Sequence, residues 1–189
     1  KASATLSDRG YAAMPLMLDW GPDSTVFTVT SGDFQKNSLK IFGHAYTDDA
    51  LLPLRELFQY TQTLYAYRLN GGGAKAACTY CTAKYSGIAG NKLYVVIAAN
   101  ADNADLFDVS LYYDTTLLDT QTVAAATALK DNDFVTWKTT ASLAATAKTP
   151  LTGGTNGTAN AAAHQAALDK FESYSFNTLG CPSDDSTTI

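Results

Sequence analysis

Two glycine-rich segments divide this chain into parts with different patterns of apolar and polar residues, and this division limits the fold more than any other feature. The segments are Asn70-Gly71-Gly72-Gly73 and Gly153-Gly154. Outside them, helical and strand patterns alternate, whereas the residues between them form short β-rich runs separated by turns. We therefore predict an α/β body made of residues 1–73 and 154–189, interrupted by an inserted β domain at residues 74–153.

The α/β body is expected to hold a mixed sheet with helices. Residues 11–20 form an almost continuous apolar run, which predicts a strand buried on both faces, with Pro15 favouring an edge position or a bulge. Apolar spacing also predicts a helix capped by Ser31 and another that begins at Thr47, with Pro53 in its first turn. The same patterns predict strands at 25–30 and 63–69, a helix at 159–173 and a short buried strand at 176–179.

Short alternating segments fill the region between the two glycine-rich segments. Strands are expected at residues 77–85, 92–99, 106–113, 117–123, 134–138 and 143–152, with one or two helical turns at 124–130. So many short strands in about 80 residues are typical of a small barrel or sandwich. The predicted fold class is therefore α+β and multidomain, with an α/β body interrupted by an inserted small all-β barrel or sandwich.

Charge and composition exclude several classes of function. The chain has 46% hydrophobic and 16% charged residues, which is a globular composition. Its net charge is -5 and no stretch is strongly basic, so we expect no direct contact with nucleic acid. No apolar run reaches the roughly 18–20 residues of a membrane span, so we expect no membrane insertion. Three cysteines do not suggest a disulfide framework and favour assembly in the cytoplasm.

The cysteines and histidines do not form a recognised catalytic pattern. Cys78 and Cys81 have the spacing of a zinc half-site or a redox pair. They fall in a predicted strand, where residues three apart point to opposite faces, and we interpret them as ordinary reduced thiols. His44 and His164 have no G-x-S-x-G nucleophile to serve, so we interpret them as helix-surface or capping residues.

The glycine-rich and acidic segments lack the motifs of ligand sites as well. Residues 71–75 and 153–158 do not match the phosphate-loop pattern, and we expect tight turns there. Asp102, Asp105 and Asp108 do not have calcium-loop spacing, and we expect a solvated loop. The sequence therefore predicts no catalytic, cofactor-binding or metal-binding residue.

A series of motifs along the chain nevertheless resembles one known family. The N-terminal motif RGYAAMPLMLDWG, at residues 9–21, resembles a signature of contractile phage tail sheath proteins of the myophage and defective-prophage type from Gram-positive bacteria. Further motifs follow in the family's order and extend the resemblance over residues 8–185: LRELF at 54–58, YRLN at 67–70, AKYSGIAGN at 83–91, DFVT at 133–136 and LTGGTNG at 151–157.

The resemblance implies a structural subunit of a virion tail. Such subunits polymerise helically around a tail tube and contract once, without nucleotide, to drive the tube through the host cell envelope. The partners implied are other sheath subunits, the tail tube protein, the baseplate and the tail terminator, with assembly in the bacterial host cytoplasm. The family joins its subunits through N- and C-terminal arms that add strands to a neighbour's sheet.

The ends of the chain lead us to expect an excised part of a longer sheath protein. The chain begins at Lys1 and stops at Ile189, soon after an acidic loop. Compared with the family, the extreme N-terminal arm, the C-terminal domain and the C-terminal arm are not found in this sequence. We therefore expect residues 1–189 to form a monomer or a weak oligomer.

Two other functions remain alternatives at this point. A carbohydrate- or protein-binding module on the inserted β domain would need an exposed aromatic platform, for example of Tyr85, Tyr94, Tyr112 and Tyr113. Tyr112 and Tyr113 are adjacent, so at most one of them serves a given face of a strand. An α/β hydrolase or transferase would need its remaining catalytic residues beyond Ile189.

Overall fold

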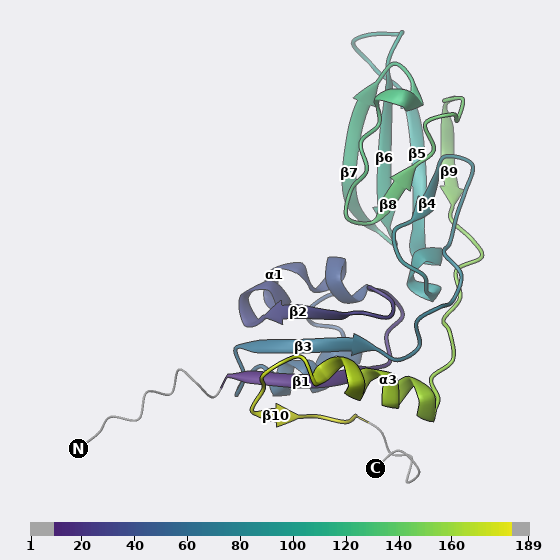
Figure 1. Ribbon diagram of the computed structural model, residues 1–189. Coiled ribbons are helices and arrows are strands. Elements are labelled where there is room, and N and C mark those ends of the chain that lie inside the picture. The colour runs from purple at the N-terminus through teal and green to yellow at the C-terminus, as the bar shows by residue number, and fades with distance from the viewer. Residues whose placement is uncertain (1–9, 183–189) are drawn as a thin grey trace. The chain divides into compact units, whose positions relative to one another are not determined.

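The computed structural model describes residues 10–182, which form two compact units. Unit 1 comprises residues 10–72 and 157–182, and unit 2 comprises residues 73–156. Helices and strands both contribute to the structure (Figure 1), so the predicted α+β class is confirmed. The expectations about the two ends of the chain concern residues 1–9 and 183–189, which lie outside the described residues.

A four-stranded mixed sheet forms the centre of unit 1, with the strand order β10-β1-β3-β2. β1 runs parallel to both β10 and β3, whereas β2 runs antiparallel to β3. The strands are β1 (Tyr11–Leu16), β2 (Val26–Thr30), β3 (Thr63–Arg68) and β10 (Thr178–Leu179).

Helices cover both faces of this sheet (Figure 1). Leu64 and Ala66 of β3 belong to the core that also contains Phe34 and Leu54 of the first two helices. Tyr67 points to the opposite face, because successive side chains of a strand alternate, and it packs in a second core with α3. The helices are α1 (Ser31–Phe42), the 3-10 turn η2 (Asp49–Leu51) that leads into α2 (Leu52–Leu57), and α3 (Ala161–Phe171).

The first two predicted helix starts are displaced by one residue. Thr30, not Ser31, caps α1, because its hydroxyl accepts the backbone N–H of Asp33. Asp48, not Thr47, caps η2 by accepting the backbone N–H of Ala50. In both places the residue that caps is the one whose side-chain oxygen reaches the unpaired N–H groups of the first turn.

Two sheets make up unit 2. The larger has the order β7-β6-β5-β9 and is antiparallel throughout, and the smaller pairs β4 with β8. Alternate residues of β5 and β6, such as Val95 and Leu111, are fully buried. The elements are β4 (Cys81–Ala83), η3 (Ile88–Lys92), β5 (Leu93–Ala99), β6 (Phe107–Tyr113), β7 (Thr116–Val123), η4 (Ala126–Ala128), β8 (Val135–Trp137) and β9 (Thr146–Pro150).

The predicted strand at 77–85 was wrong over most of its length. Only Cys81–Ala83 is a strand, and Ala77 makes an isolated antiparallel bridge to Thr82. Residues 78–81 therefore turn the chain back on itself, so the backbone groups of Ala77 pair with Thr82 instead of continuing a straight strand. This turn changes the position of the two cysteines that it contains.

Pro15 lies inside β1, but on a side where the neighbouring strand has already ended. The carbonyl groups of Tyr11 and Ala13 accept N–H groups from Asn177 and Gly180, so they face β10. Pro15 is two residues further along and faces the same side, beyond the two residues of β10. Its missing N–H therefore costs no hydrogen bond of the sheet.

Among the described residues, no helix has the length and apolar character that crossing a bilayer requires.

Candidate functional site

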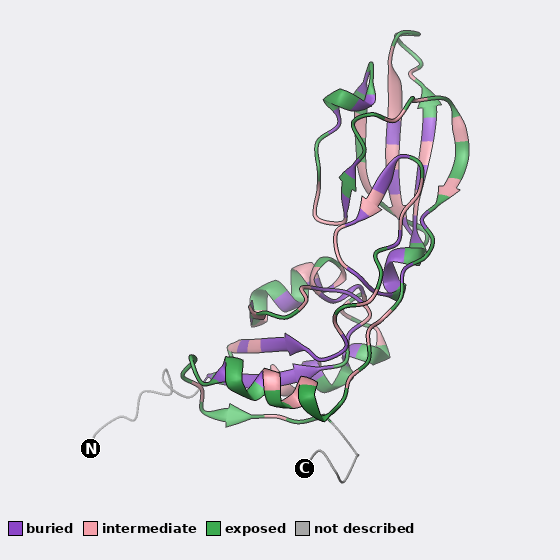
Figure 2. Ribbon diagram, turned by 45° about the vertical axis from the view of Figure 1, so that its right-hand side comes forward, coloured by how far each residue is buried: buried purple, intermediate pink, exposed green. Residues whose placement is uncertain are grey.

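β10 closes one side of the unit 1 sheet and presents an exposed edge. Both of its residues, Thr178 and Leu179, are exposed, whereas β1 beside it is buried from its second residue onwards (Figure 2). The prediction of a buried strand at 176–179 was therefore wrong, because an apolar residue such as Leu179 lies here at the border of the sheet. Within residues 10–182, no strand pairs with the outer side of β10. Backbone N–H and C=O groups at such an edge can pair with another chain.

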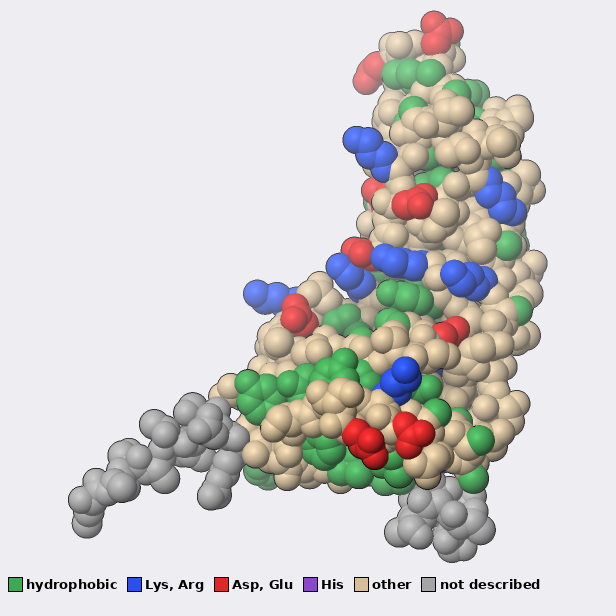
Figure 3. Space-filling model, in the orientation of Figure 1, with side chains coloured by type: hydrophobic (Ala, Val, Ile, Leu, Met, Phe, Trp, Pro, Cys, Tyr) green, Lys and Arg blue, Asp and Glu red, His purple; other side chains and the backbone are tan. Residues whose placement is uncertain are grey.

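Three tyrosines line the sheet face next to this edge. The rings of Tyr11 and Tyr65 stack with centroids 6.0 Å apart, and those of Tyr65 and Tyr174 are 4.8 Å apart. Tyr11 and Tyr174 are 40% and 37% exposed, so α3 leaves this part of the face accessible. Apolar side chains gather on the face of unit 1 that carries α3 and β10 (Figure 3).

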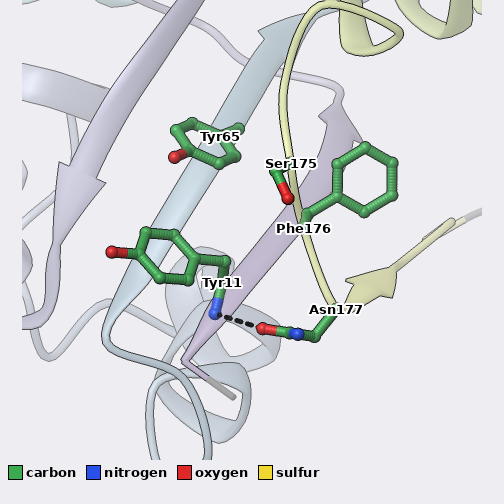
Figure 4. Close-up of a pocket in the computed structure, with 5 residues that line it drawn as sticks. All are labelled: Tyr11, Tyr65, Ser175, Phe176 and Asn177. Carbon is green, nitrogen blue, oxygen red and sulfur yellow. Dashed lines mark hydrogen bonds between the residues drawn. The ribbon is translucent and has the colours of Figure 1, made fainter. Parts of the chain in front are cut away.

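A hollow of about 360 Å³ lies beside these rings, and we call it the aromatic hollow. Figure 4 shows its lining residues, with Tyr11 and Tyr65 on neighbouring strands. The Asn177 side-chain oxygen accepts the backbone N–H of Tyr11 at 3.3 Å, which ties the segment before β10 to the start of β1. The lining is aromatic and polar without a charged group: Tyr11, Tyr65, Ser175, Phe176 and Asn177.

A smaller apolar hollow of about 160 Å³ lies further along the same edge, next to Pro15 of β1 and Leu168 of α3. Its exposed apolar members are Leu168 of α3 and Leu179 of β10, at 43% and 46% exposure. His164 also lines it, together with Pro15, Gly180 and Cys181. An aromatic and polar hollow and an apolar one thus lie beside the β10 segment, together a surface suited to contact with another protein chain.

His44 and Arg68 both have acidic partners inside unit 1. His44 Nδ1 lies 2.9 Å from Asp48, in the segment between α1 and α2, where it orders the turn. Arg68 is 1% exposed, and its guanidinium lies 3.1 Å from both Asp23 and the carbonyl oxygen of Gly21. Burial lowers the pKa of Arg68, while Asp23 and Asp19 raise it. Arg68 was not among the residues predicted from the sequence, although a charged residue in an apolar strand is a usable signal.

The two glycine-rich segments approach each other closely instead of forming a phosphate loop. A Cβ atom at Gly157 would overlap the carbonyl oxygen of Gly71, and the Gly157 N–H donates to Asn70 at 2.9 Å. In unit 2, a Cβ atom at Gly73 would overlap the carbonyl oxygen of Thr155. Close backbone packing therefore requires glycine at these positions. This agrees with the prediction that the two segments are tight turns and not phosphate loops.

The loop expected around Asp102, Asp105 and Asp108 ends before Asp108, which lies in β6 and has neutral partners. Asp108 accepts hydrogen bonds from Thr122 at 2.6 Å and from Asn100 at 2.9 Å. These bonds, with that of Thr122 the larger effect, lower the pKa of the Asp108 carboxyl group. In the part of the chain that the structure describes, no group of three or more His, Cys, Asp and Glu side chains could hold a metal ion.

The tyrosines of unit 2 do not form the platform that a binding module would need. Tyr94 and Tyr112 stack with centroids 5.0 Å apart, and Lys148 Nζ lies 4.3 Å from the centre of the Tyr94 ring. Tyr113 points the other way and is 5% exposed, as its position next to Tyr112 predicts. Of Tyr94, Tyr112 and Tyr113, the first two therefore share a face and the third does not.

Cys78 and Cys81 lie side by side, contrary to the prediction that they point to opposite faces. Their sulfur atoms are 3.7 Å apart, and the Cys78 N–H donates to the Cys81 carbonyl oxygen at 2.9 Å. The hydrogen bond from Cys81, aided by the Tyr80 N–H and by Lys138, lowers the pKa of the Cys78 thiol to about 6. The hydrogen bond to Cys78 and burial raise the pKa of Cys81. The turn described above is what brings the two thiols together.

Comparison with known proteins gives consistent matches along the chain. The model of the tail sheath protein Gp18 domain III N-terminal region matches residues 9–69, and that of the phage tail sheath protein beta-sandwich domain matches residues 70–156. Among curated proteins, the phage-like element PBSX protein XkdK of Bacillus subtilis is 35% identical over 82% of this chain. The uncharacterized protein YqbK of the same organism is 30% identical over 96% of this chain.

Solved structures extend the match to the whole chain. The sheath tail protein of Desulfitobacterium hafniense has a TM-score of 0.87 at 36% identity over 99% of this chain. That of Listeria innocua has a TM-score of 0.80 at 30% identity over 100% of this chain. The chain spans less than half the length of each relative. The shares are 33% of XkdK, 43% of YqbK, 45% of the Desulfitobacterium hafniense protein and 43% of the Listeria innocua protein.

Proposed function

Because the chain belongs to the phage tail sheath protein family, we propose that it polymerises helically around a tail tube and contracts to drive the tube through the host cell envelope. The observation that carries this proposal is the consecutive match of two sheath family models over residues 9–156. Both matching family models and both solved structures are named as tail sheath proteins, so the chain is a structural sheath subunit and not an enzyme. The matches do not favour the alternative of a binding module.

We propose that the chain is organised as an α/β body of residues 1–73 and 154–189 with an inserted β domain of residues 74–153. A small sandwich or barrel is the proposed architecture of that insertion. Two features support it: the antiparallel sheets of unit 2, and the beta-sandwich description of the family model over residues 70–156. The division of contacts into two units, at Gly72/Gly73 and Asn156/Gly157, is in keeping with this organisation.

The outer edge of β10 is the proposed contact with another sheath subunit. Main-chain groups of an edge strand accept an added strand from a second chain, and pockets beside the edge select its side chains. The aromatic hollow and the exposed Leu179 supply such pockets next to β10. A head-to-tail contact of this kind repeats without closing and so generates a helical polymer.

Contraction in this proposal is a change of subunit contacts rather than of subunit fold. Each unit has its own buried core, so it can keep its structure while interfaces exchange between two discrete arrangements. The energy would be stored in the extended lattice. The tail tube protein, the baseplate and the tail terminator are the further proposed partners, with assembly in the bacterial host cytoplasm.

Immunogold electron microscopy tests this function directly. Antibodies raised against purified residues 1–189 are applied to particles released from the bacterium that carries the gene after treatment with a DNA-damaging agent. We expect gold particles along the whole length of tails in the extended state and along shortened tails in the contracted state. Labelling confined to heads, tail tips or exposed tubes, with bare outer tails, would contradict a sheath role.

A further inference from the structure

We propose that Cys78 and Cys81 form a redox-active dithiol, which small disulfide oxidants convert into an intramolecular disulfide. The two residues flank the turn that leads into β4, and no part of the sheath function above uses them. Both thiols are free in the structure. This inference concerns only the cysteine pair, so its failure would leave the proposed sheath function unaffected.

The backbone of the turn already holds the two thiols at bonding range. The Ala77–Thr82 bridge and the hydrogen bond from the Cys78 N–H to the Cys81 carbonyl place the two residues opposite each other. Their sulfur atoms are 3.7 Å apart, and a disulfide bond is about 2.0 Å long. Rotation of the two side chains therefore closes most of the gap, without separating elements of the fold.

The two thiols differ in the way that a disulfide-forming pair requires. Cys78 is half-buried, its sulfur accepts the Tyr80 N–H at 3.4 Å, and the Lys138 ammonium group binds the Cys78 carbonyl oxygen at 2.6 Å. These neighbours stabilise a thiolate at Cys78, which is the nucleophile in thiol–disulfide exchange. Cys81 is 0% exposed. It is therefore suited to the second, intramolecular step rather than to attack on a reagent from solvent.

Oxidised glutathione serves as the oxidant, and the reaction has two balanced steps. The Cys78 thiolate attacks one glutathione sulfur, forms a mixed disulfide and releases one glutathione thiolate. Cys81 then loses its proton to the solvent and attacks the Cys78 sulfur, which forms the Cys78–Cys81 bond and releases the second thiolate. The pair gives up two electrons and two protons in total, and glutathione disulfide is reduced to two thiols.

The second step is helped by the first. A thiolate at Cys78 adds to the hydrogen bond and the burial that disfavour ionisation of Cys81. Once Cys78 is bound in the mixed disulfide, its negative charge is gone, and Cys81 ionises more readily. Mixed disulfide at Cys78 is therefore expected to be short-lived in the native chain.

Cys181 provides a matched control within the same chain. It is exposed and belongs to unit 1, whereas Cys78 and Cys81 belong to unit 2. Oxidised glutathione is expected to form a stable mixed adduct with this thiol, because Cys181 is the one cysteine of unit 1 and has no second thiol in that unit to resolve the adduct. The two kinds of cysteine therefore give different products in one reaction.

The test is peptide mapping by mass spectrometry of reduced residues 1–189 after incubation with oxidised glutathione. We expect a cross-linked peptide containing Cys78 and Cys81, lighter than the reduced peptide by two hydrogens, while Cys181 carries glutathione. In the Cys81→Ser variant we expect the glutathione adduct to accumulate at Cys78, and the Cys181→Ser variant should still form the cross-link.

Two results would overturn the proposal. One is a stable glutathione adduct at Cys78 of the native chain with the Cys81 thiol still free. The other is no loss of the Cys78 and Cys81 thiols under conditions in which Cys181 is fully modified. The native chain alone gives both readouts, so the test does not depend on whether a variant folds.

Discussion

Replacing Gly157 with alanine should destabilise unit 1, because this glycine lies where two backbone segments touch. The new Cβ atom would overlap the Gly71 carbonyl oxygen and lie 2.8 Å from the Gly71 carbonyl carbon and 3.2 Å from the Asn70 carbonyl oxygen. These neighbours are backbone atoms, so no flexible side chain can move aside. The two segments must therefore separate.

The cost of this separation follows from two contributions. Overpacking of a close contact costs about 1–3 kcal/mol. The segments would also weaken the hydrogen bond from the Gly157 N–H to the Asn70 carbonyl oxygen, now 2.9 Å long, at about 0.5–1.5 kcal/mol. We expect a loss of about 2–4 kcal/mol in the free energy of unfolding, a large part of the roughly 5–15 kcal/mol typical of domains.

Urea unfolding followed by circular dichroism and tryptophan fluorescence measures this loss. Trp20 is 1% exposed in unit 1 and the other tryptophan, Trp137, lies in unit 2, so the comparison is made in a Trp137→Phe background, where the emission reports on unit 1. The control is Gly32→Ala at the start of α1, where an added Cβ meets no atom within 4 Å. That variant should be stabilised by up to about 1 kcal/mol. If Gly157→Ala unfolds at the same urea concentration as the native chain, the reasoning about close backbone packing is wrong.

Three further predictions concern single side chains. Phe34→Ala should lower the free energy of unfolding by about 3–5 kcal/mol in thermal denaturation, because the ring is 1% exposed among other aromatic rings; a change below about 1 kcal/mol would contradict the assigned core. Thr122→Val should raise the pKa of Asp108 in an NMR titration, because its carboxylate loses the hydrogen bond that lowers its pKa. The hydrogen bond from Thr122 to the Asp108 carboxylate therefore stabilises the fold above the unfolded-state pKa of Asp108, and this contribution is lost as pH falls through the folded-state pKa. An unchanged pKa of Asp108 in the variant would contradict this prediction. Alkylation of Cys78 by iodoacetamide should reach half its maximal rate near pH 6, and Cys81→Ala should move this midpoint upwards; a midpoint unaffected by the substitution would show that Cys81 does not stabilise the thiolate.

The regular strands of unit 2 could be predicted from the sequence because their side chains alternate. The segments expected at 92–99 and 106–113 are the observed β5 and β6 to within one residue at each end. In such strands the local pattern and the buried face agree, so the pattern alone is sufficient. The β10 segment shows the opposite case, because whether a short apolar strand is central or at an edge depends on which strands pair beside it.

The cysteine pair and Arg68 show why residues at a candidate site were harder to predict. Thr79 and Tyr80 between the cysteines are not typical turn residues, so a continuous strand was the better prediction from local sequence. The turn forms because Ala77 pairs with both Thr82 and Thr152, the second of which is distant in the chain. The partners of Arg68 are likewise distant in sequence, and no local pattern identifies them.

The central claim is that this chain is repeated along the outside of a tail as its sheath. Helical reconstruction by cryo-electron microscopy of particles carrying the gene product, in extended and in contracted form, tests that claim most directly. The account predicts density for the folds of units 1 and 2 in every subunit of the outer layer, around a separate inner tube, with different subunit contacts in the two forms. Density that fits these folds only in the inner tube or the baseplate would contradict it.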